Sequence, residues 1–354
     1  MMREKIREKE KESFLFQNND LIFDPNYDQG FWLNLHDESN ADHWHQDSIS
    51  GWKDERKKFF LLEKGEQEAL KICIGFFLAG DTILNGELCE KVLDLVKNTQ
   101  IKPFWYLQLS REVIHSITYR KMADSISDIK EINDILKIHI KKESVKEKID
   151  YIKKYTNEDS LLIEIFAVFV CYEAILFSTS FLIFFVISSK YGKNKIPALT
   201  TANNYISIDE NKHFIYNACI LRKLINEIKI PESKEIIKNI FLKAVEIEKK
   251  YAKEMFQNIE IGFDEQKINN YVEFWANKSW SHIFLNEILF VGIENPYFKE
   301  TMHLMSHQKV NTFEVQNTLY TTYSIGSLLS KDNINDVNKQ VDELISNFEI
   351  YKFK

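Results

Sequence analysis

Glycine and proline are scarce in this sequence, which has only 10 glycines and 5 prolines among 354 residues. A sheet protein with many turns needs more of both, because these residues end regular elements and form tight turns. No internal repeat and no glycine-rich phosphate loop is visible. The scarcity counts against a turn-rich sheet protein and favours long helices.

Cysteine and net charge are also low. The four cysteines are scattered without a Cys-x-x-Cys pair, which predicts reduced thiols in a cytosolic protein. The net charge is -7 and lysines are spread among acids without a basic stripe, so no nucleic-acid partner is expected. Residues 1–12 are almost all charged, which predicts no signal peptide and a cytoplasmic location.

Apolar residues make up 44% of the chain and recur at helical spacing in several long segments. The main segments are residues 65–97, 103–126, 163–188, 197–228 and 232–259. More exposed helices are expected in 128–157, and a further amphipathic one in 267–288. By contrast, residues 1–20 are polar and highly charged, and we expect them to form a flexible arm.

The segment 163–188 is nearly all apolar and long enough to cross a bilayer. Glu173 near its middle argues against a membrane span, because a carboxylate at bilayer depth is costly. The other amphipathic helices could surround this segment, and a helix that is apolar all round can form the centre of a large domain. We therefore expect no membrane association.

Two Glu-x-x-His pairs stand out within these segments. Glu112 and His115 lie in segment 103–126, and Glu210 and His213 lie in segment 197–228. Residues three positions apart share one face of a helix, so each pair presents a carboxylate and an imidazole together.

Two further carboxylates, Asp81 and Glu173, lie in apolar surroundings where an unpaired carboxylate would be costly. Four successive helices thus supply a carboxylate, a Glu-x-x-His pair, a carboxylate and a second pair. This is the ligand set of a four-helix di-metal carboxylate protein. Carboxylates can bridge two Fe²⁺ or Mn²⁺ ions, and each imidazole caps one ion while positions stay open for dioxygen.

Chance and purely structural roles are the alternatives. A chain with nine histidines is expected to contain about one Glu-x-x-His by chance. A third pair, Glu300 and His303, follows the helix-breaking Asn295 and Pro296 and is interpreted as such an accident. Buried ion pairs would explain any one of the six residues, but not their order along four helices.

Around these six residues the sequence resembles the radical-generating small subunit of class I ribonucleotide reductase. The resemblance is carried by residues 76–81, 112–119, 173–181, 206–213, 294–296 and 311–314. It implies an all-α, ferritin-like helical bundle of about eight main helices in residues 21–323. Residues 324–354 would form a C-terminal tail that docks on the large subunit.

The resemblance also implies roles for the site residues. Two irons, with manganese as an alternative, would be bound by Asp81, Glu112, His115, Glu173, Glu210 and His213. The reduced di-iron centre would react with dioxygen and oxidise Tyr119 to a stable radical. A dry pocket around this radical would be formed by Phe177, Phe181 and Ile206.

A path for the radical out of the subunit is implied as well. Asp209 would link His115 to a surface tryptophan, for which Trp44 is the candidate. Tyr320 would then pass the radical to the large subunit, which holds the nucleotide. A homodimer, or a heterodimer with another small subunit, is expected from the family.

The sequence departs from the family at several positions. Trp44 lies one residue further from Asp81 than expected, so Trp32 and Trp52 remain alternatives. Residue types unusual for the family stand at Ile117, Ile208 and Gln316. The tail ends in 347–354 with its charge reversed, which would change how it docks on a large subunit.

Three functions therefore stay open. A working radical subunit is favoured, because the metal ligands and Tyr119 are all present. The alternatives are an auxiliary, non-radical small subunit that acts as partner or scaffold, and a ferritin-like oxidase or iron-binding protein. Iron storage needs no radical path, so Asp209 and Tyr320 count against the last of these.

Overall fold

The computed structural model describes residues 2–17, 24, 27–84, 90–190, 195–285 and 287–304. Within these ranges the protein is helical and contains no strand. It divides into one compact unit, Met1–Thr301, and a second, Met302–Lys354. Most of the second unit lies outside the described residues, so the expected domain of residues 21–323 and tail of residues 324–354 stay predictions.

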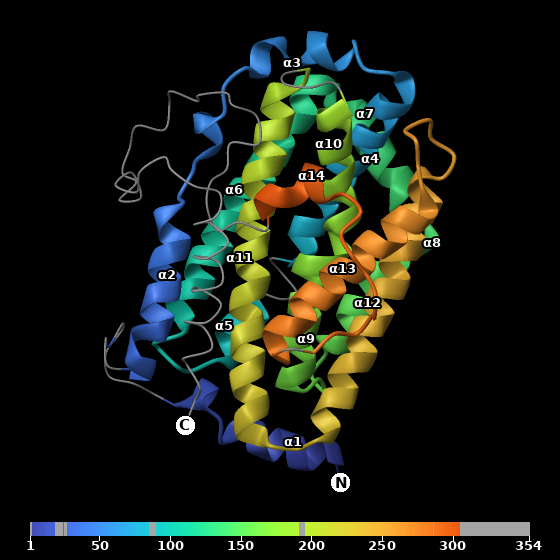
Figure 1. Ribbon diagram of the computed structural model, residues 1–354. Helices are drawn as coiled ribbons and strands as arrows, with labels where there is room; N and C mark the ends of the chain where they lie inside the picture. Colours follow the sequence, from blue (N-terminus) through green and yellow to red (C-terminus); the bar gives the residue numbers. More distant parts are fainter. Residues whose placement is uncertain are drawn as a thin grey trace, which may run out of the picture. The chain divides into compact units, whose positions relative to one another are not determined.

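Four helical segments form the centre of the first unit. They are α4 (Lys64–Leu84), α6 (Lys102–Ile126), the run of α9 (Leu162–Cys171), η5 (Tyr172–Leu176) and α10 (Ser178–Lys190), and α11 (Pro197–Ile228). α6 packs against α4 and α11, and α9 packs against α11 (Figure 1). A proline in the first turn begins both α6 and α11, as the sequence predicted.

Shorter and outer helices surround this centre. They are α2 (Phe31–Ala41), α3 (Trp52–Phe59), α5 (Glu90–Leu95), α7 (Ile129–His139), α8 (Glu143–Tyr155), α12 (Glu232–Phe256), α13 (Glu265–Ile283) and α14 (Phe298–Thr301). The predicted helix over residues 65–97 covers two described helices, α4 and α5, and residues 85–89 between them lie outside the described residues. Both α12 and α13 pack against α9 and stop a few residues before their predicted ends.

The apolar run from α9 through α10 is the core of the bundle. It is long and apolar enough to cross a membrane, but 94% of its most apolar window is buried inside the protein. α11 and α12 cover it on the α9 side, and α4 and α11 contact α10. Because its apolar surface is already covered by protein, the structure supports the interpretation of a buried core helix.

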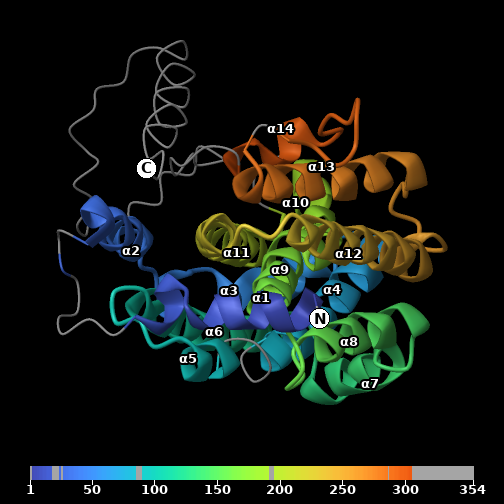
Figure 2. The same ribbon diagram turned by 90° about the horizontal axis from the view of Figure 1, so that it is seen from below.

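The N-terminal segment differs from the flexible arm that the sequence suggested. Helix α1 (Met2–Lys11) runs across one end of the bundle (Figure 2), where Ile6 is fully buried. Glu10 accepts a hydrogen bond from the Ile163 amide at 2.9 Å, and Arg3 forms an ion pair with Glu164. Glu10 thus satisfies an amide in the first turn of α9. Charged side chains reach across a long sequence separation here, which composition alone does not reveal.

Glu10 gives a pH-dependent prediction. Burial raises the pKa of the Glu10 carboxyl to about 7. A carboxyl whose pKa is raised on folding stabilises the fold at low pH, and this contribution is lost as pH rises through 7. Glu10→Gln keeps an acceptor for the Ile163 amide but cannot ionise. Between pH 5 and pH 8, the free energy of unfolding of the variant should therefore rise by about 1–3 kcal/mol relative to that of the wild type. Urea unfolding across this range checks it, with Glu12→Gln as an exposed control. Equal slopes for Glu10→Gln and the wild type would contradict the prediction.

Candidate metal centre

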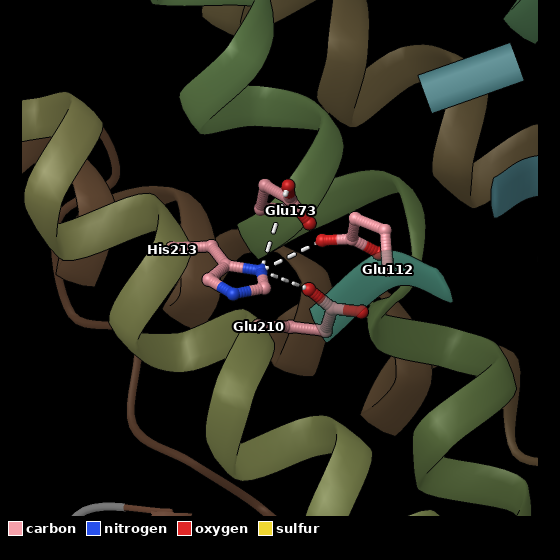
Figure 3. A group of neighbouring side chains, drawn as sticks. All are labelled: Glu112, Glu173, Glu210 and His213. Atoms are coloured by element: carbon pink, nitrogen blue, oxygen red, sulfur yellow. Dashed lines mark hydrogen bonds and ion pairs between the residues drawn. The ribbon is translucent and has the colours of Figure 1, made fainter. Parts of the chain in front are cut away.

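Three carboxylates and one imidazole converge in the middle of the bundle. Glu112 comes from α6, Glu173 from η5, and Glu210 and His213 from α11. Each offers one ligand atom, and these four atoms lie within 4.8 Å of one another. Figure 3 shows the four side chains pointing toward a common centre, and all are buried.

The two Glu-x-x-His pairs are interleaved. Glu112 places Oε1 2.9 Å from Nδ1 of His213 and Oε2 3.2 Å from Nδ1 of His115. Glu210 does the same in the opposite sense, with Oε1 3.0 Å from Nδ1 of His115 and Oε2 2.8 Å from Nδ1 of His213. Each carboxylate therefore spans both imidazoles. Carboxylates and imidazoles placed together in this way could hold two neighbouring metal ions.

Glu173 is presented by a wide helical turn. It is the second residue of η5, a π-helix inserted between α9 and α10. Its Oε1 lies 4.0 Å from Nδ1 of His213 and accepts a hydrogen bond from Nε2 of Gln108 at 2.9 Å. Single π-turns inside α-helices are rare and are frequent at functional sites.

Asp81 belongs to α4, but its side chain lies outside the described residues. The backbone just before it is fixed, because the Tyr172 hydroxyl donates to the carbonyl of Gly80 at 3.0 Å. A methyl group added to Gly80 would lie 3.1 Å from both this hydroxyl and the ring of Phe177. Glycine therefore allows α4 to approach the π-turn closely at this point.

The donor set suits divalent metal ions. Burial alone would lower the pKa of His213, but Glu112 and Glu210 raise it to about 9. Burial would also lower the pKa of His115, but the charges of Glu210 and Glu112 raise it well above its usual range. The buried carboxylates thus draw positive charge into the site. Divalent ions would supply that charge and leave both imidazoles neutral for coordination, and carboxylate and imidazole donors match iron or manganese.

A series of hydrogen bonds leads away from His115. Its Nε2 lies 3.2 Å from Oδ2 of Asp209, and the same oxygen accepts from the indole Nε1 of Trp44 at 2.7 Å. The Trp44 and His115 rings are nearly parallel, 5.9 Å apart. Trp44 is only 4% exposed and is not the surface residue that was expected, because it also packs against Tyr205. Trp32 donates to Asp28 instead.

Tyr119 is fully buried one helical turn beyond His115. Its ring stacks on Phe77 with 4.7 Å between centroids, and Phe77 in turn contacts Phe177 and Phe181. Ile206 is also fully buried. The aromatic cluster is therefore centred on Phe77, a residue of α4.

The protein comparisons agree with this geometry. A family model described as "Ribonucleotide reductase, small chain" matches residues 23–296. The protein belongs to this ribonucleotide reductase family. Among curated relatives, the ribonucleoside-diphosphate reductase small chain of Plasmodium falciparum (isolate Dd2) is 33% identical over 260 residues, which cover 73% of this sequence and 71% of that protein. The ribonucleoside-diphosphate reductase small chain of Vaccinia virus (strain Copenhagen) is 28% identical over 302 residues, which cover 85% and 90%.

Solved small-subunit structures confirm the fold. The ribonucleotide reductase Rnr4 homodimer from Saccharomyces cerevisiae gives a TM-score of 0.72 at 23% identity, covering 83% of this protein and 91% of that one. The dimanganese(II)-NrdF structure from Streptococcus sanguinis gives 0.67 at 18% identity, covering 82% and 99%. The expected all-α, ferritin-like bundle is therefore confirmed.

Three residues that support the site in this ribonucleotide reductase small subunit were not predicted from the sequence. Gln108 holds Glu173, and Asn217 donates to the carbonyl of His213 at 2.9 Å. Arg111 is buried, and its Nη1 lies 4.0 Å from Oδ2 of Asp209. Burial would raise the pKa of Asp209, but the hydrogen bond to His115 and the charge of Arg111 lower it. Gln108 and Asn217 lie one turn from a ligand on its own helix face, a spacing that could have revealed both.

Some expected residues cannot be placed. Tyr320, Gln316 and the tail of residues 324–354 lie outside the described residues. Of the third Glu-x-x-His pair, Glu300 falls in α14, which has only four residues. That pair therefore does not lie on a long helix, which agrees with its interpretation as an accident of sequence.

Proposed function

We propose that this protein is the small subunit of a ribonucleoside-diphosphate reductase, and that it generates a radical on Tyr119 for deoxyribonucleotide synthesis by a large subunit. The observation that carries the proposal is the interleaved pair of carboxylates between two imidazoles, one turn from a buried tyrosine. A metal site of this kind without a neighbouring buried tyrosine would suit oxidation or storage equally well.

Glu112, Glu210, His115 and His213 would together hold two metal ions. Glu173 would add a further carboxylate to this set, and Asp81, whose side chain lies outside the described residues, is the remaining predicted ligand. Two reduced metal ions bound here would supply, together with dioxygen, the oxidising power for the tyrosine. Iron is proposed and manganese is the alternative, since carboxylate-rich sites accept both.

The residues around Tyr119 would protect its oxidised form. Tyr119 gives up one electron and its phenolic proton, which leaves a neutral radical. The stacked ring of Phe77 and the neighbouring Phe177 and Phe181 exclude water and reductants from it. A dry, closely packed pocket leaves no room for a solvent molecule to reach the phenolic oxygen.

The connected residues His115, Asp209 and Trp44 would link the centre to the large subunit. Asp209 holds the indole N–H at 2.7 Å, so it can accept the proton when Trp44 loses an electron. Tyr320 would continue the path, with the tail of residues 324–354 docking on the large subunit. A homodimer, or a heterodimer with another small subunit, and a cytoplasmic location are part of the proposal. Iron storage would not require this connected path.

The proposal is tested by loading the protein with Fe²⁺ without oxygen and then admitting air. We expect about two irons per subunit, because the site offers two imidazoles joined by two bridging carboxylates. An EPR signal of a tyrosyl radical should follow. Parallel loading with Mn²⁺ decides between the metals. A protein that stays metal-free in both would refute the metal centre, and full sites without a radical would leave the auxiliary subunit as the better description.

A further inference from the structure

A buried ion pair lies next to the π-turn that carries Glu173. Lys148 of α8 and Glu248 of α12 are 2% and 0% exposed, and Nζ of Lys148 lies 2.6 Å from Oε2 of Glu248. Burial lowers the pKa of Lys148 to about 8, against the opposing effect of Glu248. Taking two charges out of water is expensive, so such a pair is weak evidence for stability and invites another explanation.

Both charges also bind the backbone where the π-turn meets α10. Lys148 donates to the carbonyl of Leu176 at 2.6 Å, and Oε1 of Glu248 accepts from the amide of Thr179 at 3.1 Å. Leu176 is the last residue of η5, and Thr179 lies in the first turn of α10. A π-turn holds one more residue than an α-turn and disturbs the regular pairing of backbone groups. At the junction of the π-turn and α10, the Lys148 ammonium therefore binds a backbone carbonyl and the Glu248 carboxylate binds a backbone amide.

The two side chains are themselves held rigidly. The ammonium of Lys148 lies 3.5 Å from the ring centre of Tyr251 and 4.1 Å from that of Phe76. The Tyr251 hydroxyl is 3.1 Å from Oγ of Ser180, one residue beyond Thr179. Cation–π contacts of a desolvated lysine restrict it strongly. Because its own side chains are restricted, the pair can restrain the backbone of η5.

We propose that Lys148 and Glu248 are positioning residues for Glu173: they hold the π-turn in register and so aim this carboxylate at the metal centre. The start of the same turn is tied to α4 by the bond from Tyr172 to Gly80. With both ends fixed, Glu173 faces His213. If the turn relaxed to α-helical register, the direction of every side chain in η5 would change. The inference rests on the proposed function for its metal readout, but not for its backbone readout.

The test is a double variant that replaces both charges with apolar residues, Lys148→Met with Glu248→Leu. Apolar replacement of a buried ion pair is often tolerated, so the protein should fold. We expect the amides of residues 174–179 to exchange hydrogen at least about tenfold faster. Of two Co²⁺ ions per subunit, one should bind about 10- to 100-fold more weakly, with changed d–d absorption bands. The control is Lys249→Met with Glu273→Leu, a pair between α12 and α13, which should leave both readouts unchanged.

Different results would contradict the metal centre and the positioning role of Lys148 and Glu248. Wild-type protein that binds no Co²⁺ would refute the metal centre, while the exchange measurement would still decide on the pair. Two Co²⁺ ions bound equally well by wild type and double variant, with unchanged exchange, would overturn the positioning role. If the double variant does not fold, Glu248→Gln and Glu248→Ala decide: glutamine can still accept from Thr179 and should retain protection and the Co²⁺ spectrum, whereas alanine should lose both. Equal behaviour of these two would overturn the proposal.

Discussion

Tyr119→Phe is expected to abolish the tyrosyl radical signal while about two metal ions per subunit still bind. Phenylalanine keeps the ring that stacks on Phe77, so the pocket stays filled. It lacks the O–H whose proton must leave when the electron is removed, and no neutral radical can form. Reductase turnover with a large subunit should fall at least about a thousandfold. The free energy of unfolding should change by no more than about 1.5 kcal/mol, since only one hydroxyl is lost.

The matched control is Tyr216→Phe, another fully buried tyrosine, whose hydroxyl donates to the carbonyl of Ile101. It should lose a similar amount of stability but keep the radical signal and the turnover. EPR spectroscopy, metal analysis and activity are measured on the same samples. A full radical signal in Tyr119→Phe would show that another residue is oxidised. Loss of the bound metal would show instead that Tyr119 supports the site structurally.

The helices that carry the site could be predicted from the sequence because their signals are local. Pro103 and Pro197 mark the first turns of α6 and α11, and the i, i+3 spacing sets each glutamate beside its histidine. That the two pairs interleave, with each carboxylate spanning both imidazoles, depends on how α6 and α11 pack. Spacing within one helix contains no information on this arrangement.

Other features of the site have no local signal. Nothing in residues 163–188 distinguishes a π-turn at Tyr172–Leu176 from a continuous α-helix, because nearly the whole run is apolar. The contacts that fix this turn come from Lys148 and Glu248, on helices that are distant in the sequence. The contact of Glu10 with the first turn of α9 is another such case. It helps to hold the charged segment α1 against the bundle as a packed helix, where the sequence had suggested a flexible arm. These features depend on polar contacts between residues that are far apart in the sequence. Hydrophobic periodicity indicates only local secondary structure, so it does not predict them.

Trp44→Phe is the second large effect, and it should separate radical formation from radical use. The substitution removes the indole N–H that Asp209 binds at 2.7 Å but leaves an aromatic ring against His115. The Tyr119 radical should still form, within about twofold of the wild-type yield, because Tyr119 and the metal ligands are unchanged. Turnover with a large subunit should fall at least about a hundredfold, since the electron and proton have lost their carrier. A stability loss of about 1.5–3 kcal/mol is expected from the missing bond to a charged partner.

Trp32→Phe and Trp52→Phe are the controls, because both residues were alternatives for the same role. The indole of Trp32 donates to Asp28 rather than to Asp209, so its loss should cost stability and leave turnover near the wild-type value. Steady-state turnover and EPR spectra of the three variants, each with equal metal content, make the comparison. If Trp32→Phe or Trp52→Phe lost turnover while Trp44→Phe kept it, the path would not run through Asp209 and Trp44. Equal turnover in all three would mean that none of these three tryptophans carries the radical, and would favour an auxiliary role beside a second small subunit.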